Sequence, residues 1–249
     1  MKQINKVAPI TLLFWLMKIV ATTLGETLGD FISMTLHSGY IVGIMITLSI
    51  FIVALFVQLS SEEYVPAKYW FVIIGTTTLG TEISDFMDRT LHFGYLLGSL
   101  FLMVLLVITL VLWYRKFGNL EVYPIYRRNQ EVYFWTAVLI SNSLGTAFGD
   151  FLSDNLGLSY LQGSLAAGII ILVVVMLHYF TRLNSIALFW IAFIFTRPFG
   201  ATFGDLLTKP VSTGGLDLGT LNASVVCIVL MAIMIIISHS LHPSSKQSA

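Results

Sequence analysis

The chain has 249 residues, of which 57% are hydrophobic and 10% are charged, and its mean hydropathy is +0.88. These values exclude an ordinary soluble domain and indicate an integral membrane protein. A formal net charge of zero argues against nucleic-acid binding through bulk charge, and the single cysteine, Cys227, excludes a disulfide framework.

One motif recurs four times along the chain. In each copy a Trp is followed ten residues later by a Gly, and that Gly is followed five residues later by an Asp. The copies are Trp15/Gly25/Asp30, Trp70/Gly80/Asp85, Trp135/Gly145/Asp150 and Trp190/Gly200/Asp205. They belong to internal repeats, which we place at 10–60, 65–114, 130–180 and 185–238.

Each repeat is predicted to contain two helices. The first carries the motif, and the second is almost purely apolar, over 39–59, 94–114, 160–180 and 216–238. Because about 20 apolar residues span a bilayer, we expect an all-α, polytopic membrane protein with eight transmembrane helices in a single membrane domain, 1–249. Two helices per repeat make the four repeats parallel to one another.

The distribution of Lys and Arg predicts the orientation. Nine of the thirteen lie in the termini, Lys2 and Lys246 included, or between repeats, where the longest connection, 114–134, separates two halves. The positive-inside rule places these segments in the cytoplasm, so we expect both termini there, a bacterial cytoplasmic (inner) membrane and no cleavable signal peptide. The motif Trp rings are then expected at the inner interface, and each Asp, about 22 Å further along its helix, in the outer half of the bilayer.

Each first helix carries a polar stripe, because residues four apart share a helix face. The stripes are Lys18, Thr22, Glu26 and Asp30; Thr77, Thr81, Asp85 and Arg89; Asn142, Thr146, Asp150 and Asp154; and Arg197, Ala201, Asp205 and Lys209. Carboxylates and bases cannot face lipid cheaply, so we expect the stripes to converge on one interior space and to form an ion pathway.

The stripes differ in charge. Asp85 and Asp205 each have a base four residues later, which predicts fixed ion pairs, whereas Asp30 and Asp150 have none. If repeats 1 and 3 face each other, a metal cation between them would meet Glu26 with these two aspartates. The neutral oxygens of three further residues would complete the site, and four bases would compensate charge. The neutral ligands are Thr22, Asn142 and Thr146, and the bases are Lys18, Arg89, Arg197 and Lys209. Fixed ion pairs or helix caps for all the carboxylates remain the alternative.

Glycines and two histidines have separate interpretations. Small residues four apart, such as Gly25 and Gly29, predict close helix packing, and we expect the second helices to receive these contacts at Gly43, Gly98, Gly163 and Gly219. His37 and His92 follow their motif Asp by seven residues and are weak metal-ligand candidates, interfacial histidines being the more usual case. Glu82 and Asp88 lie off the stripe and are expected to meet a neighbouring repeat.

The fourfold signature GETLGDF, GTEISDF, GTAFGDF and GATFGDL resembles a bacterial family of integral membrane proteins built from four copies of a short GxxxGD repeat of unknown function. GETLGD also looks like the Glu-x-Gly-Asp motif of manganese and calcium exchangers, although two residues separate Glu26 from Gly29 here. The second resemblance implies cation chemistry.

We therefore expect a gradient-driven exporter or antiporter of a divalent cation of the Mn²⁺ type, the only bound group foreseen, because such ions prefer oxygen ligands. Desolvated carboxylates can also exchange protons, so protons are expected as coupling partners beside the lipid bilayer. A proton-coupled carrier of a small organic solute, held by Arg197 and Lys209, and a non-transporting scaffold or sensor are the alternatives. No catalytic motif predicts an enzyme, and the oligomeric state stays open.

Overall fold

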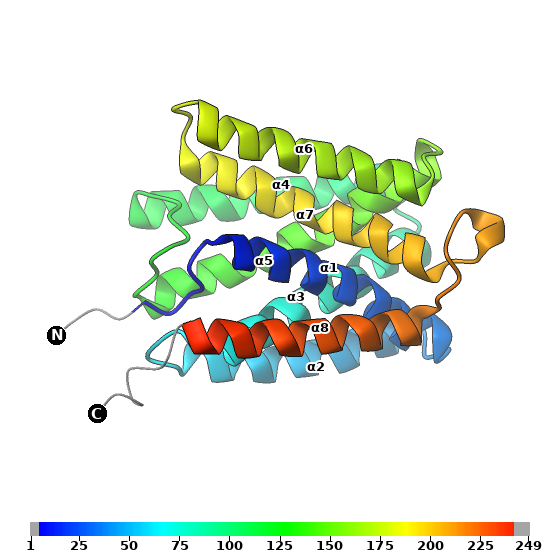
Figure 1. Ribbon diagram of the computed structural model, residues 1–249, viewed down its shortest axis with the longest axis horizontal. Helices are drawn as coiled ribbons and strands as arrows, with labels where there is room; N and C mark the ends of the chain where they lie inside the picture. Colours follow the sequence, from blue (N-terminus) through cyan, green and yellow to red (C-terminus); the bar gives the residue numbers. More distant parts are fainter. Residues whose placement is uncertain (1–4, 242–249) are drawn as a thin grey trace.

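The computed structural model describes residues 5–241, which form eight α-helices and no strand (Figure 1). The helices are α1 Leu12–Asp30, α2 Tyr40–Leu59, α3 Pro66–Asp85, α4 Tyr95–Phe117, α5 Arg128–Asp150, α6 Tyr160–Phe180, α7 Ser185–Thr208 and α8 Thr220–Leu241. The predicted all-α class and the two helices per repeat are confirmed. Lys2 and Lys246, on which the expected location of the termini partly rests, lie outside the described residues.

The four motif helices form an inner ring in the order α1, α3, α5, α7, with α7 packing back against α1. The motif glycines explain this close packing. A Cβ at Gly25 would collide with Thr77 of α3, and a Cβ at Gly200 would collide with Thr22 of α1. A Cβ at Gly145 would likewise collide with Arg197 of α7, and one at Gly80 would lie 3.0 Å from the backbone nitrogen of Ser143 in α5, a tight contact. Each motif Gly therefore lets the next helix of the ring approach.

The second helix of each repeat packs on the first helix of the following repeat: α2 on α3, α4 on α5, α6 on α7, and α8 on α1. Gly43, Gly98 and Gly163 receive the side chains of Glu82, Asp88 and Thr202, respectively.

The prediction for the fourth second-helix glycine, Gly219, is wrong. It precedes α8 with a φ of +75°, and a Cβ there would meet nothing within 4 Å. Gly43 is the fourth residue of α2, and the fourth residue of α8 is Ala223, which is buried. A small side chain therefore takes the packing position in α8.

Six of the eight helices are long and apolar enough to cross a membrane: α1, α2, α4, α6, α7 and α8. The outer helices expose large apolar side chains, among them Met45, Leu97, Ile169 and Ile236. Such a surface is typical of contact with lipid. The remaining two helices, α3 and α5, belong to the inner ring, where neighbouring helices cover their polar side chains. The molecule is a helical membrane protein.

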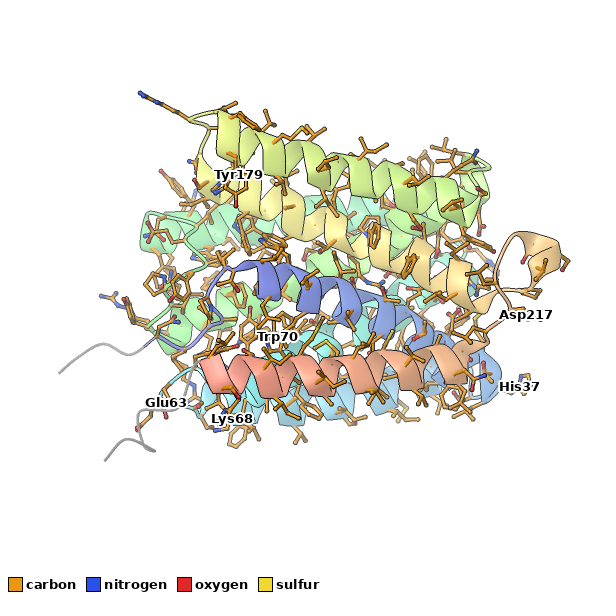
Figure 2. All side chains as sticks on the ribbon, in the orientation of Figure 1. His37, Glu63, Lys68, Trp70, Tyr179 and Asp217 are labelled. Carbon is orange, nitrogen blue, oxygen red and sulfur yellow. The ribbon has the colours of Figure 1, made fainter. Side chains whose placement is uncertain are left out.

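The two ends of the ring differ. We call the end with the motif tryptophans the Trp end and the end with the motif aspartates the Asp end. Figure 2 shows Lys68 at the Trp end and His37 and Asp217 at the Asp end, and the described chain starts and finishes at the Trp end (Figure 1). Between α4 and α5 the chain is irregular only over 118–127, so the connection is shorter than the predicted 114–134.

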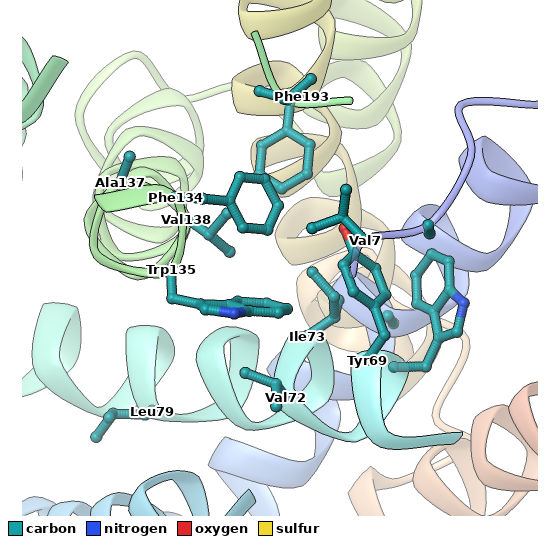
Figure 3. Close-up of a cluster of buried hydrophobic side chains, with 14 of the residues drawn as sticks. Val7, Tyr69, Val72, Ile73, Leu79, Phe134, Trp135, Ala137, Val138 and Phe193 are labelled. Atoms are coloured by element: carbon teal, nitrogen blue, oxygen red, sulfur yellow. The ribbon is translucent and has the colours of Figure 1, made fainter. Parts of the chain in front are cut away.

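Packed aromatic rings close the Trp end (Figure 3). Trp135 lies 4.9 Å from Phe134 and 5.2 Å from Tyr69, measured between ring centroids. Trp70, Trp135 and Trp190 are buried among protein side chains at this end. Trp190, for example, packs edge-on against Trp113 of α4, with 5.8 Å between ring centroids.

Candidate functional site

The polar stripes lie inside the ring, as their cost in lipid predicts. The described stripe residues are buried with three exceptions: the half-buried Arg89 and Lys209, and the exposed Asp154. In repeats 1 to 3 the motif Asp ends its α-helix and a five-residue π-helix follows, for example Phe31–Thr35 after Asp30. Asp154 is exposed although it lies four residues after Asp150, whereas Arg89, at the equivalent position of repeat 2, is half-buried and contacts Asp85.

A first ion group joins repeats 4 and 1 at the Asp end. The Lys209 Nζ atom lies 2.7 Å from Asp30 Oδ2 and 3.2 Å from Asp205 Oδ1. One ammonium group thus serves two buried carboxylates from neighbouring helices, α1 and α7.

A second ion group joins repeats 2 and 3. Arg89 Nε lies 3.8 Å from Asp85 Oδ1, and one of its terminal nitrogens lies 3.7 Å from Asp150 Oδ2. These distances exceed those of good hydrogen bonds, so the guanidinium holds its two carboxylates more loosely than Lys209 holds its own.

The two ion groups are equivalent under a shift of 120 residues, which carries the first half of the chain onto the second. The corresponding pairs are Asp30 with Asp150, Asp85 with Asp205, and Arg89 with Lys209. In both groups a base contacts the Asp of its own repeat and the Asp of the following repeat in the ring. The charged layer at the Asp end therefore has a pseudo-twofold arrangement.

This geometry corrects the predicted division of labour among repeats. Asp30 and Asp150 are not free of bases, and repeats 2 and 4 are not neutralised within themselves, because each base is shared with the following repeat. The i,i+4 rule found the partners of Asp85 and Asp205 but could not find partners on a neighbouring helix. The one sequence signal for this sharing was that a base follows the motif Asp by four residues in repeats 2 and 4 but not in repeats 1 and 3.

One helical turn deeper, Glu26 and Arg197 form a fully buried ion pair of 2.8 Å. Arg197 also donates to the Thr22 carbonyl, at 3.2 Å, and to the Thr81 hydroxyl. Because α1 and α7 are neighbours in the ring, this pair lies beside the first ion group rather than facing α5.

Three carboxylates converge where these two groups meet. One oxygen from each of Glu26, Asp30 and Asp205 lies within 4.8 Å of the other two, and all three residues are buried. The prediction placed Asp150 in this group. The structure places Asp205 there instead, because α7 and not α5 adjoins α1.

The neutral side chains expected to complete a cation site have other hydrogen-bond partners. Thr22 Oγ1 donates to backbone carbonyls, including that of Thr196 at 3.1 Å, and Thr146 Oγ1 donates to the carbonyl of Asn142 at 3.3 Å. The Asn142 amide joins Lys18 to Thr76. Thr22 and Asn142 therefore connect ring helices, whereas Thr146 bonds within α5.

Lys18 does not compensate a carboxylate, contrary to the prediction. Its Nζ atom donates to Asn142 Oδ1 at 2.9 Å and lies 4.1 Å from the centroid of the Phe193 ring. None of the ion pairs within residues 5–241 includes Lys18.

The remaining predicted residues lie outside the charged layer. His37 and His92 are exposed, and the carboxylate group that could hold a metal contains neither. Glu82 meets α2 of the preceding repeat at Gly43, as expected, whereas Asp88 meets Gly98 in α4 of its own repeat.

The sequence interpretation missed a buried ion pair at the Trp end, where Lys6 Nζ lies 2.6 Å from Glu131 Oε2. The Gln58 amide also donates to Glu131, at 2.9 Å. The pair fastens the chain before α1 to α5.

Fold and site together define a helical membrane protein made of four two-helix repeats around a buried charged layer. A family model described as "Repeat of Unknown Function (DUF347)" matches residues 13–64, 68–118, 133–184 and 188–242, and the chain belongs to this family. Comparison with curated proteins and with solved structures gave no match. Each matched segment covers one helix pair whose second helix packs on the next repeat, so the family repeat completes its packing only in the ring.

Proposed function

We propose that the protein is a gradient-driven transporter that exports or exchanges a divalent metal cation of the Mn²⁺ type. In this proposal all eight helices cross a bacterial cytoplasmic membrane, and the Trp end and both termini lie in the cytoplasm. The observation that carries it is the convergence of three buried carboxylates, Glu26, Asp30 and Asp205. Carboxylate oxygens are the ligands that such cations prefer.

The charge balance at this site leaves room for a cation. Arg197 and Lys209 supply two positive charges against the three carboxylates. Arg197 is fully buried, whereas the Lys209 side chain is 24% exposed and lies just beyond the end of α7. We assign Lys209 as the displaceable occupant: its flexible stem lets the ammonium swing toward water, and an incoming cation takes its place between Asp30 and Asp205.

Access to the site is asymmetric. The half-buried Lys209 marks the approach from the Asp end, while the buried aromatic rings around Trp70 and Trp135 block the Trp end. A cation could therefore enter from the Asp end in this conformation and would leave toward the Trp end, or travel in reverse, only after the ring helices rearrange. Parallel repeats with a pseudo-twofold axis suit such a rearrangement of one half against the other.

The scaffold or sensor alternative draws on a different observation, the ion pairing of Glu26 and Asp30. Carboxylates held permanently by bases would make the charged layer a structural connection between repeats. The organic-solute alternative is less favoured, because Arg197 and Lys209 both already contact carboxylates.

Metal flux into liposomes containing the purified protein decides among these functions. A panel of divalent metals is offered at several external pH values, and proton movement is followed with a second dye. We expect Mn²⁺ entry with opposite proton movement in the wild type and its loss in Glu26→Gln and Asp205→Asn. Asp217→Asn, which changes an exposed acid at the same end of the molecule, is the matched control. If no metal moves at any pH and no proton movement follows metal addition, the proposal of cation transport is wrong.

A further inference from the structure

The Lys18 amine stands apart from the other bases of the ring. It is fully buried on α1, three residues after the motif Trp15, and therefore lies deeper toward the Trp end than the carboxylates. The residues at the same position in the other repeats are apolar and buried: Ile73, Val138 and Phe193. Packing of this layer does not require an amine, and a buried ammonium without a carboxylate is costly.

A chain of hydrogen bonds determines which atom of the Asn142 amide faces the Lys18 amine. The Thr76 hydroxyl donates to the Ile73 carbonyl at 2.7 Å, so its oxygen is left to accept from the Asn142 amide nitrogen at 3.0 Å. This orientation turns Asn142 Oδ1 toward Lys18, where it is the one hydrogen-bond acceptor of the amine among the described residues. Only one of the three ammonium N–H groups is thus satisfied by an oxygen.

The charged and polar groups around Lys18 come from all the neighbouring ring helices. From α5 it meets the Asn142 amide, with Thr76 of α3 behind it. From α7 it meets the face of the Phe193 ring, and the positive charge of Arg197 on the same helix acts against that of the ammonium. On α1 itself Glu26 follows two turns later and is occupied by Arg197. In a medium of low dielectric constant, these two positive charges oppose a metal cation moving from the carboxylates toward the Trp end.

We propose that Lys18 is the proton-coupling residue of this transporter: a metal cation passes the Lys18 layer only after the ammonium has released its proton. This inference rests on the proposed transport function. The proton leaves to water on the side from which the cation arrives, and the electron pair of the broken N–H bond stays on nitrogen. Once the cation has passed, the amine takes up a proton from water on the other side. The metal ion and the Lys18 proton exclude each other, so one proton moves at this residue for each cation.

The test is metal and proton flux in liposomes with variants that fix the charge at this position. Lys18→Arg carries a charge that cannot be removed, and Asn142→Asp places a carboxylate of nearly the same shape beside the ammonium. Both are expected to lower metal flux about tenfold or more, because each stabilises the positive charge. Mn²⁺ binding at Glu26, Asp30 and Asp205 should persist in both variants. Lys68→Gln, half-buried on α3 at the Trp end, is the control.

The neutral variant Lys18→Met gives the complementary result. It is expected to fold, since its equivalents in the other repeats are apolar, and to move metal with less proton counterflow and a flatter dependence on pH. Wild-type metal flux and wild-type proton counterflow in Lys18→Arg and Asn142→Asp would overturn the role of Lys18 while leaving metal transport intact. Absence of metal flux in the wild type would instead overturn transport itself, and this inference with it.

Discussion

At the scale of single residues, the charged layer is held together by two bases, each of which contacts two carboxylates. Lys209 and Arg89 occupy equivalent positions, yet the Lys209 contacts are 2.7 and 3.2 Å and the Arg89 contacts are 3.8 and 3.7 Å. Removing the base that has the shorter contacts to buried carboxylates is therefore expected to cost more folding free energy.

We therefore expect Lys209→Met to destabilise the protein by about 3 kcal/mol, because two buried carboxylates lose their partner. Arg89→Met should cost less. Thermal unfolding of both variants in detergent, each compared with Lys68→Met on the same ring, measures the difference. Equal losses for the two variants would show that contact length does not decide their contributions.

Sequence reasoning at this scale succeeded within a helix and failed between helices. The pairs Asp85 with Arg89 and Asp205 with Lys209 follow from i,i+4 spacing and are present. The longer-range pair of Asp30 with Lys209 depends on which helices adjoin in the ring, and no spacing within one repeat contains that information.

At the scale of helices, the motif glycine determines how closely the ring packs. A Cβ at Gly200 would collide with the side chain and the backbone of Thr22, and backbone cannot move aside without shifting α1. By contrast, a Cβ at Gly168 in α6 would lie 3.5 Å from Phe199, an ordinary contact distance.

We expect Gly200→Ala to destabilise the protein by about 1–3 kcal/mol through overpacking. Gly168→Ala, the same change on an outer helix, should be tolerated. Unfolding in detergent measures both substitutions. A fully stable Gly200→Ala would mean that the contact between α7 and α1 is looser than the structure shows.

Two features of the helices could not be predicted from the repeat. The sequence indicates two helices per repeat correctly, but the packing of α2 on α3 rather than on α1 is a property of the closed ring. The π-helical turns after Asp30, Asp85 and Asp150 are likewise invisible to a 3.6-residue period.

At the scale of the whole molecule, the pseudo-twofold charged layer and the asymmetric Lys18 layer stack along one axis. The composition predicted a helical bundle, and the even number of helices predicted that both chain ends lie on the same side of it. The described chain does begin and end on one side (Figure 1). The ring follows the order of the repeats along the chain, so repeats 1 and 3 lie opposite each other, as the predicted cation site assumed.

The proposed topology places His37 outside the cell and Glu62 inside. His37→Cys and Glu62→Cys, each exposed and each made in a Cys227→Ala background, report on opposite ends of the bundle. We expect a membrane-impermeant maleimide to label position 37 in intact cells and position 62 only after permeabilisation. The reverse pattern would invert the orientation, and labelling of both positions in intact cells would contradict a membrane-spanning ring.

The most direct test of the carboxylate site is Mn²⁺ binding to the purified protein, followed by the loss of the free-ion electron paramagnetic resonance signal. We expect saturable binding that weakens as pH falls, because protons compete for the same carboxylates. Glu26→Gln and Asp205→Asn should both abolish it, and Asp217→Asn should leave it unchanged. Saturable binding that survives in both Glu26→Gln and Asp205→Asn, or no saturable binding in the wild type at any pH, would contradict a metal site formed by Glu26, Asp30 and Asp205.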